Sequence, residues 1–185
     1  MTMRPTNDSP IFLIGYRGTG KTTLGRRLAA RLGYDSIDAD DQIEQRAGQT
    51  IAQIFATEGA EAFRELESQV VAELCERRSV VVALGGGAVL REGNRAAIES
   101  VGPVVWLTAS VEAIHQRVAA DEATGSRRPN LTNMDSRSEI EALLAERTPI
   151  YRECATFEVD TEGKTPDAIV DEIVRRLAEH PADDS

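Results

Sequence analysis

The stretch that most constrains this 185-residue chain is Gly15-Tyr16-Arg17-Gly18-Thr19-Gly20-Lys21-Thr22-Thr23. It follows a strand-like apolar run at 11–14 and continues into a helical pattern at 24–32. A strand, a loop with the pattern G-x-x-x-x-G-K-T and a helix together form a phosphate-binding P-loop. The glycines let consecutive backbone N–H groups face an anion that side chains would obstruct. The stretch therefore predicts a nucleotide-phosphate site, with a helix-capping turn as the alternative.

Two side chains of this loop have specific chemistry. Lys21 can bring a mobile full charge to the β- and γ-phosphates, and Thr22 can offer its hydroxyl to Mg²⁺. Lys21 is conspicuous because Lys164 is the only other lysine among the 21 basic residues. We assign nucleotide binding in this loop to Gly18, Thr19, Gly20, Lys21, Thr22 and Thr23.

Composition narrows the class of protein. The net charge of −10 argues against a general nucleic-acid surface. No apolar run approaches the roughly 20 residues that cross a bilayer, and the polar first ten residues lack the apolar segment of a signal peptide. We therefore expect a cytoplasmic protein with no nucleic-acid or membrane partner. Cys75 and Cys154 are isolated and are expected to be reduced thiols. His115 and His180 lack partners at metal-ligand spacing, which argues against a zinc site.

Short apolar runs alternate with helical patterns along the chain. Strands are expected at 11–14, 34–38, 79–84, 101–107 and 155–159. Helical patterns separate them, including one that Ser110 can cap and one that starts near Pro166, whereas the polar segment 121–136 is expected to be a loop. This alternation predicts an α/β fold of three α/β/α layers with a five-stranded parallel sheet. Ligands of such sheets bind beyond the carboxyl ends of the strands.

Candidate site residues follow two further strands. Asp38 and Asp40 come after the second strand, and their spacing puts both carboxylates on one side if the chain is still extended there. One could hold Mg²⁺, directly or through water, while the other receives a substrate hydroxyl; the alternative is that both cap a helix in a surface loop. Gly85-Gly86-Gly87 follows the third strand. Three glycines cost backbone entropy, which favours amides that approach a ligand closely over a plain turn.

Arginines supply candidate anion contacts. Arg64 lies one helical turn before Glu67, so the two can pair. A guanidinium held by a carboxylate can grip an anionic substrate bidentately, although an ordinary surface ion pair is the alternative. Arg128, in the polar loop, could close its charge over a transferring phosphate, and Arg147 lies within a helical pattern, although each of these arginines taken singly is more typical of a surface position.

In this order and at this spacing, the segments resemble the shikimate kinases, small P-loop kinases of the nucleoside-monophosphate-kinase-like group. The resemblance covers about 10–177. The combination of Asp-x-Asp, Phe-Arg-x-x-Glu and three glycines is far more specific than the P-loop alone. The matching segments are 15–23, Asp38-Ala39-Asp40, Phe63-Arg64-Glu65-Leu66-Glu67, Gly85-Gly86-Gly87-Ala88-Val89, Arg128-Pro129 and Arg147-Thr148-Pro149-Ile150-Tyr151.

The resemblance implies ATP-dependent phosphorylation of the shikimate 3-hydroxyl in the aromatic amino-acid pathway, with Mg²⁺ as cofactor. It implies one P-loop kinase domain over 1–185, which we expect to be a monomer. Its core would comprise 9–39, 79–119 and 155–178, with a substrate-binding helical insert at 40–75 and a lid at 120–136.

The resemblance also assigns roles to individual residues. Lys21, Asp40 and Arg128 would be catalytic, Arg117 and Arg128 would join the loop in binding ATP, and Glu67 would orient Arg64. Thr22 and, through water, Asp38 would hold the metal, and the loop 161–166 would pass the adenine edge. Shikimate would be bound by Asp40, Arg64, Gly86, Gly87 and Arg147.

Two departures from the family pattern are visible. The lid reads Arg128-Pro129-Asn130-Leu131, where the family usually has Arg-Pro-Leu-Leu. Arg17 occupies a commonly uncharged position, and we expect it to point to solvent. The alternatives are another small-metabolite kinase of this fold, such as a gluconate or nucleoside monophosphate kinase, or a nucleotide switch. A guanine-specific switch would need an N-K-x-D motif, which the sequence lacks.

Overall fold

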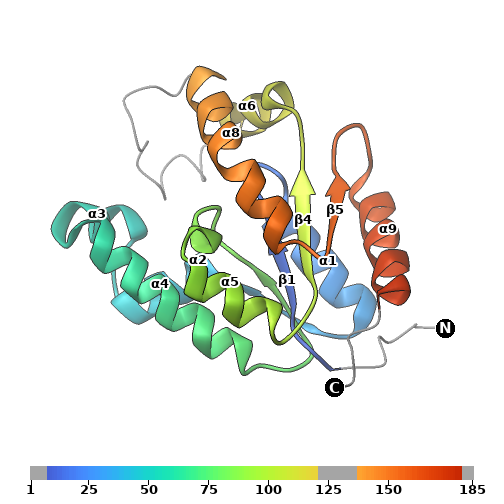
Figure 1. Ribbon diagram of the computed structural model, residues 1–185, viewed down its shortest axis with the longest axis horizontal. Helices are drawn as coiled ribbons and strands as arrows, with labels where there is room; N and C mark the ends of the chain where they lie inside the picture. The colour runs from blue at the N-terminus through green and yellow to red at the C-terminus, as the bar shows by residue number, and fades with distance from the viewer. Residues whose placement is uncertain (1–7, 121–136, 181–185) are drawn as a thin grey trace.

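The computed structural model describes residues 8–120 and 137–180. Its five strands form one parallel sheet in the order β2-β3-β1-β4-β5. The strands are β1 (Ile11–Ile14), β2 (Asp35–Asp38), β3 (Val80–Ala83), β4 (Val104–Thr108) and β5 (Phe157–Asp160). The predicted five-stranded parallel sheet is confirmed, and β1, which precedes the P-loop, lies at its centre (Figure 1).

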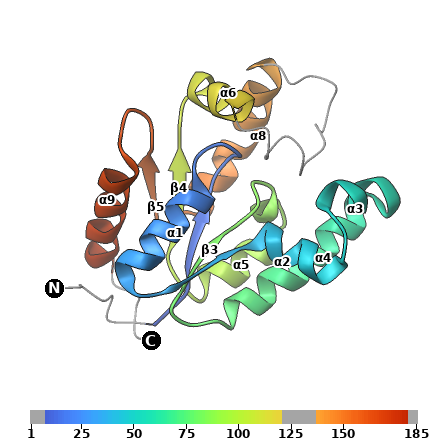
Figure 2. The ribbon, with the colours of Figure 1, turned by 180° about the vertical axis from the view of Figure 1, so that it is seen from behind.

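Helices cover both faces of the sheet. The helices α1 (Lys21–Leu32) and α9 (Pro166–Glu179) lie on one face, seen towards the viewer in Figure 2. On the other face lie α4 (Gly59–Cys75), α5 (Glu92–Glu99) and α8 (Arg137–Cys154). The remaining elements are α2 (Ala39–Ala47), α3 (Ile51–Thr57), the 3₁₀ turn η1 (Ala88–Leu90) and α6 (Val111–Ala120).

Strand periodicity divides the core into two layers. Phe12 and Ile14 pack with the α4, α5 and α8 layer, whereas Ile11 and Leu13 pack with α1 and α9. Successive side chains of a strand point to opposite faces, so all four residues of β1 are buried. This explains why the central strands are continuous apolar runs, while the edge strands β2 and β5 carry exposed residues.

Local signals set several helix ends where the sequence predicts them. The Ser110 hydroxyl accepts a hydrogen bond from the Ala113 N–H at 3.1 Å and so caps α6. Helix α9 begins at Pro166, with Thr165 as its capping residue. Gly48 ends α2 in the left-handed conformation that favours glycine. Cys75 and Cys154 are free thiols, as predicted.

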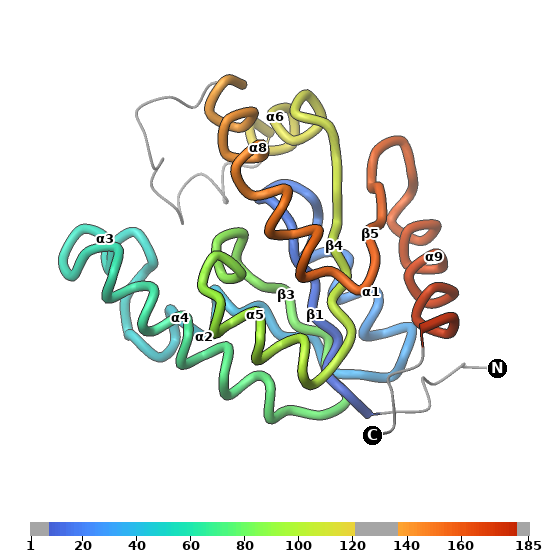
Figure 3. Tube along the Cα trace, viewed as in Figure 1, coloured from blue at the N-terminus to red at the C-terminus, as the bar shows by residue number. Residues whose placement is uncertain are grey.

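The segment from α2 to α4 lies to one side of the sheet, with α3 farthest from the strands, as the Cα trace in Figure 3 shows. Its helices pack on one another before the chain returns through β3. None of the described helices is long and apolar enough to cross a membrane.

Candidate active site

The P-loop connects β1 to α1 and depends on glycine at three positions. Gly15, Gly18 and Gly20 have φ values of 137°, 79° and 91°, a range that side-chain-bearing residues rarely adopt. A Cβ at Gly15 would also overlap the carbonyl oxygen of Leu107 in β4. The loop therefore stays close to the sheet and leads directly into the N-terminus of α1, where an anion is favoured.

Lys21 reaches back over this loop. Its Nζ donates hydrogen bonds to the carbonyl oxygens of Gly15, at 2.8 Å, and Tyr16, at 2.9 Å. The Thr19 hydroxyl donates to the same Tyr16 oxygen at 2.8 Å. The ammonium group is thus held at the centre of the loop by neutral acceptors, which a phosphate could replace.

Thr22 and Asp38 bring together the first turn of α1 and the end of β2. The Thr22 hydroxyl donates to Asp38 Oδ2 at 2.6 Å. Burial raises the pKa of Asp38; the hydrogen bond from Thr22 opposes that shift, and the charges of Asp40 and Asp41 add to it. A partly buried carboxylate crowded by acids beside a hydroxyl presents the hard oxygen donors that Mg²⁺ prefers.

The condition under which Asp38 and Asp40 would share one side, an extended chain, is not met. The chain turns helical at Ala39, and Asp38 caps α2 by accepting the Asp40 N–H at 2.9 Å. The capping alternative therefore holds for Asp38, which also contacts Thr22. Asp40 stands in the first turn of α2. Its side chain therefore does not follow the two-residue alternation of an extended strand.

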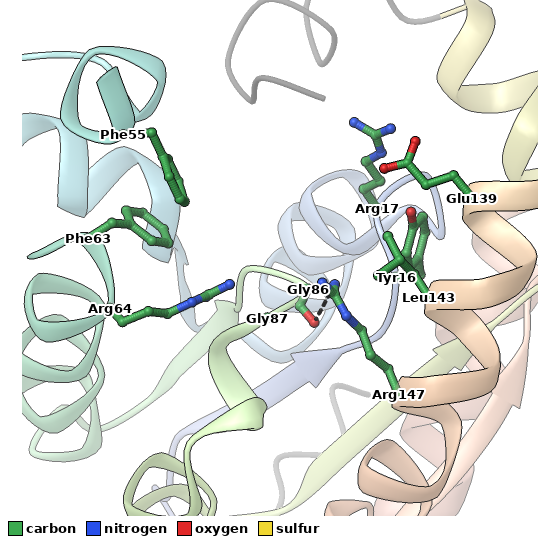
Figure 4. Close-up of a pocket in the computed structure, with 10 residues that line it drawn as sticks. All are labelled: Tyr16, Arg17, Phe55, Phe63, Arg64, Gly86, Gly87, Glu139, Leu143 and Arg147. Atoms are coloured by element: carbon green, nitrogen blue, oxygen red, sulfur yellow. Dashed lines mark hydrogen bonds between the residues drawn. The ribbon is translucent and has the colours of Figure 1, made fainter. Parts of the chain in front are cut away.

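A cleft lies beyond the carboxyl ends of the strands, beside the P-loop (Figure 4). It holds about 570 Å³ including its open mouth. Arg64 of α4 and Arg147 of α8 reach towards it from opposite walls, with Gly86 and Gly87 between them. The described residues that line it are Tyr16, Arg17, Phe55, Phe63, Arg64, Gly86, Gly87, Glu139, Leu143 and Arg147.

Arg64 is fixed by Glu67, as its helical spacing predicts. Arg64 Nη1 donates to Glu67 Oε2 at 2.5 Å, and Glu67 is only 1% exposed. This burial excludes the ordinary surface ion pair considered for these residues. The guanidinium also packs on the Phe63 ring, 5.2 Å from its centroid, and lies against the backbone of Gly87.

Arg147 holds the facing position on α8. It is 8% exposed, and its Nη1 donates to the Gly86 carbonyl at 3.4 Å. Its guanidinium lies over the ring of Tyr16, 5.8 Å from the centroid, so a P-loop side chain supports it. Residues four apart lie on the same face of a helix. Leu143 and Glu139, one turn and two turns before Arg147 on α8, therefore line the same cleft.

Arg117 of α6 connects the P-loop to the segment after β5. Its Nη1 donates to the Gly18 carbonyl at 3.3 Å and to the Thr161 hydroxyl at 3.0 Å, and its Nη2 donates to the Thr161 carbonyl at 3.3 Å. The two segments predicted to flank an adenine ring are therefore in contact.

The structure differs from the sequence expectation at other positions. Arg17, expected to point to solvent, is half-buried and lines the cleft, because the loop turns its side chain towards α8 (Figure 4). Asp40 is not among the described residues that line the cleft. Arg128 and Asn130 lie outside the described residues.

Sequence reasoning did not select Tyr16, Phe55, Glu139 or Leu143 as site residues, although all four line the cleft. The spacing of four residues between Glu139, Leu143 and Arg147 was an available signal. No sequence signal marked Phe55, because only the packing of α3 on α4 places its ring beside that of Phe63, with 4.7 Å between the ring centroids.

Comparison with known proteins identifies relatives along most of the chain. A sequence model of the family described as shikimate kinase matches residues 17–178. Shikimate kinase from Rhodopirellula baltica is 41% identical over 165 residues, covering 89% of this chain and 88% of that protein. Shikimate kinase from Pseudomonas syringae pv. tomato is 44% identical over 171 residues, covering 92% and 97%.

Solved structures give the same answer. Shikimate kinase from Acinetobacter baumannii in complex with shikimate matches with a TM-score of 0.88 and 36% identity, over 95% of this chain and 96% of that chain. A gluconokinase from Sinorhizobium meliloti, at 19% identity and a TM-score of 0.56 over 96% of each chain, shares the fold alone. On this agreement of sequence and structure, the chain belongs to the shikimate kinase family.

Proposed function

We propose that this protein transfers the γ-phosphoryl group of ATP to the 3-hydroxyl of shikimate, which gives shikimate 3-phosphate and ADP. The observation that carries the proposal is one cleft in which Arg64 and Arg147 face each other across Gly86 and Gly87, directly beside a P-loop. A carboxylic acid held by two arginines would present its hydroxyls to a nucleotide on that loop. The relative from Acinetobacter baumannii, solved with shikimate, supports this choice of acceptor.

On the donor side, the amides of residues 18–23 and Lys21 would bind the phosphates of ATP. Lys21 would exchange its bonds to the Gly15 and Tyr16 carbonyls for bonds to phosphate oxygens. Because phosphoryl transfer requires positioning and charge neutralisation more than covalent catalysis, this exchange would be the main contribution of Lys21.

Mg²⁺ fits the pair formed by Thr22 and Asp38. Thr22 would bind the ion through its hydroxyl and Asp38 through a water molecule, since Mg²⁺ retains several waters and is bound by few protein groups. Burial and the charges of Asp40 and Asp41 raise the pKa of Asp38, and a cation bound there would counter this shift by favouring the charged carboxylate. When bound, Mg²⁺ neutralises charge on the β- and γ-phosphates.

On the acceptor side, Arg64 and Arg147 would hold the carboxylate of shikimate, and the Gly86 and Gly87 backbone would contact its ring substituents. Glu67 keeps Arg64 in place. Asp40 would bind the reacting hydroxyl and accept its proton as the new oxygen–phosphorus bond forms and the bond to ADP breaks. Helix α2, which carries Asp40, packs on α4, which carries Arg64, and this supports both residues serving one ligand.

Further assignments complete the proposal. Arg117 and the 161–166 segment would flank the adenine, with the contact of Arg117 to Thr161 as support. Residues 40–75 would form the substrate-binding insert. Arg128 and the 120–136 lid, which lie outside the described residues except for Ala120, remain predictions from sequence. We also propose a cytoplasmic monomer; the two free cysteines fit a reducing compartment.

An ADP-release assay with shikimate, gluconate and nucleoside monophosphates offered side by side tests the proposed function. We expect rapid ADP release with shikimate and only background release with the others. Lys21→Ala should abolish turnover, which checks that the P-loop supplies the activity. Preferred release with gluconate or a nucleotide would contradict the proposed acceptor.

A further inference from the structure

The Gly86 carbonyl oxygen accepts two hydrogen bonds from side chains of α8. The Tyr151 hydroxyl donates at 2.5 Å and Arg147 Nη1 at 3.4 Å. Tyr151 is fully buried, and its ring packs beside Trp106 of β4, with 5.9 Å between ring centroids. A buried tyrosine hydroxyl usually has a hydrogen-bond partner. Here that partner is the backbone of the glycine segment between the two arginines.

These bonds fix the direction of the neighbouring amide. The peptide bonds of the described residues are all trans, and in a planar trans peptide the C=O and the following N–H point in opposite directions. Because the Gly86 C=O points to α8, the Gly87 N–H points away from it. Gly87 is buried, and its N–H donates to no carbonyl or side chain of the described residues. A buried amide without an acceptor is a donor available to a ligand.

The turn around this peptide is closed by a hydrogen bond from the Ala88 N–H to the Gly85 carbonyl at 3.0 Å, but neither of those groups belongs to the Gly86–Gly87 peptide itself. Without Cβ atoms, glycines rotate between backbone conformations that other residues avoid. The Arg147 bond, at 3.4 Å, lies beyond the usual range for N–H···O bonds, so the Tyr151 hydroxyl is the stronger restraint.

We propose that Tyr151 is a positioning residue for the acceptor. Its hydroxyl orients the Gly86–Gly87 peptide so that the Gly87 N–H is presented to the acceptor beside Arg147. This role rests on the proposed function, because it assumes that the acceptor is a carboxylic acid bound at Arg147.

The test removes only the hydroxyl, with Tyr151→Phe, which preserves the ring that packs on Trp106. Tyr34→Phe is the matched control, because Tyr34 is partly buried against the opposite layer of the core. For each variant we would measure kcat, the KM for shikimate and for ATP, and the direct binding of shikimate without nucleotide. The amide NMR signal of Gly87 would report the peptide's orientation independently of activity.

For Tyr151→Phe we expect a shikimate KM and dissociation constant about tenfold higher, the loss of one good hydrogen bond, with the ATP KM unchanged and the Gly87 amide signal shifted. Tyr34→Phe should behave as wild type. Wild-type shikimate affinity together with an unshifted Gly87 signal in Tyr151→Phe would overturn the proposal. An equal rise in the KM for ATP and for shikimate would also overturn it, since that result would indicate a general structural role of Tyr151.

Failure of the proposed function would appear differently. Wild-type protein would then neither bind nor phosphorylate shikimate, whatever residue 151 is. In that case the Gly87 amide signal of Tyr151→Phe still decides the structural half of the proposal. A shifted signal would support the orienting role of the hydroxyl, and an unchanged signal would refute it.

Discussion

The Arg64 guanidinium lies so close to the backbone of Gly87 that a Cβ there would stand 2.8 Å from Nη1 and 2.9 Å from Cζ. Arg64 comes from α4, whereas Gly87 follows β3. The absence of a side chain at residue 87 is therefore what lets the arginine reach the floor of the cleft. Since Glu67 holds the same guanidinium from behind, the arginine is fixed on two sides.

Gly87→Ala should weaken shikimate binding without unfolding the protein. Gly87 has φ −105° and ψ 0°, which alanine tolerates, and the displaced atoms belong to the end of a flexible side chain. We expect the shikimate KM to rise about ten- to a hundredfold, as misplaced binding groups do, with the ATP KM and melting temperature nearly unchanged. Gly93→Ala in α5, where a Cβ meets nothing within 4 Å, is the control. A normal shikimate KM for Gly87→Ala would contradict the contact.

Glu67→Gln should disorder Arg64 while preserving the shape of the residue. A hydrogen bond between charged groups is worth about 1.5–3 kcal/mol, so we expect the shikimate KM to rise about tenfold or more. Steady-state kinetics with each substrate varied in turn would measure it. Glu65→Gln is the control, because Glu65 lies on the same helix and pairs with Arg91 at 2.9 Å in an exposed position. Equal effects of the two changes would argue against a specific role for Glu67.

Asp38→Asn should separate metal binding from folding. Asparagine caps a helix as well as aspartate does, but it is a poorer Mg²⁺ ligand, so we expect kcat to fall about tenfold or more, with a higher Mg²⁺ requirement. The measurement is activity against Mg²⁺ concentration. A Mg²⁺ dependence identical to wild type would remove Asp38 from the metal site.

The same variant gives a pH-dependent stability difference in metal-free protein. Burial raises the pKa of Asp38 in the folded state. Its contribution to stability is therefore present in full below the unfolded-state pKa and is lost as pH rises through the folded-state pKa. Thermal unfolding in chelator should show Asp38→Asn more stable than wild type at neutral pH, and the gap should shrink as the pH falls towards 4, near the ordinary aspartate pKa. A gap that widens in acid would contradict the shift.

Arg117→Ala should affect the nucleotide alone. Arg117 contacts Gly18 and Thr161, and it does not line the acceptor cleft formed by the described residues. We expect the ATP KM to rise about tenfold, the scale of one or two lost hydrogen bonds, while the shikimate KM stays unchanged. Arg175→Ala, at an exposed position on α9 paired with Glu179, provides a control. A change in shikimate KM alone would refute the adenine assignment.

Local chemistry explains which parts of the site were predictable. The P-loop is one continuous segment, so its glycines, Lys21 and Thr22 carry their geometry in sequence. The Arg64–Glu67 pair was also predictable, because a helix fixes residues three apart on one side. The side-chain directions of Asp38 and Asp40 were harder to predict. An extended chain would point both side chains to one side, whereas the start of a helix points them differently, and the cap at Asp38 shows that the helix begins there.

The sequence by itself determined a parallel α/β domain, a phosphate loop and the pairing of Arg64 with Glu67, because periodicity and short-range spacing encode all three. Only the tertiary structure decided that Arg147 faces Arg64 across the glycine segment, that Arg17 turns into the cleft, and that Tyr151 reaches the Gly86 carbonyl. The reason is the strand order β2-β3-β1-β4-β5, which places β3 beside β1. Helix α8 packs against β4 and the turn η1 that follows the glycine segment, and its hydrogen bonds to Gly86 join residues more than sixty positions apart, which no local pattern specifies.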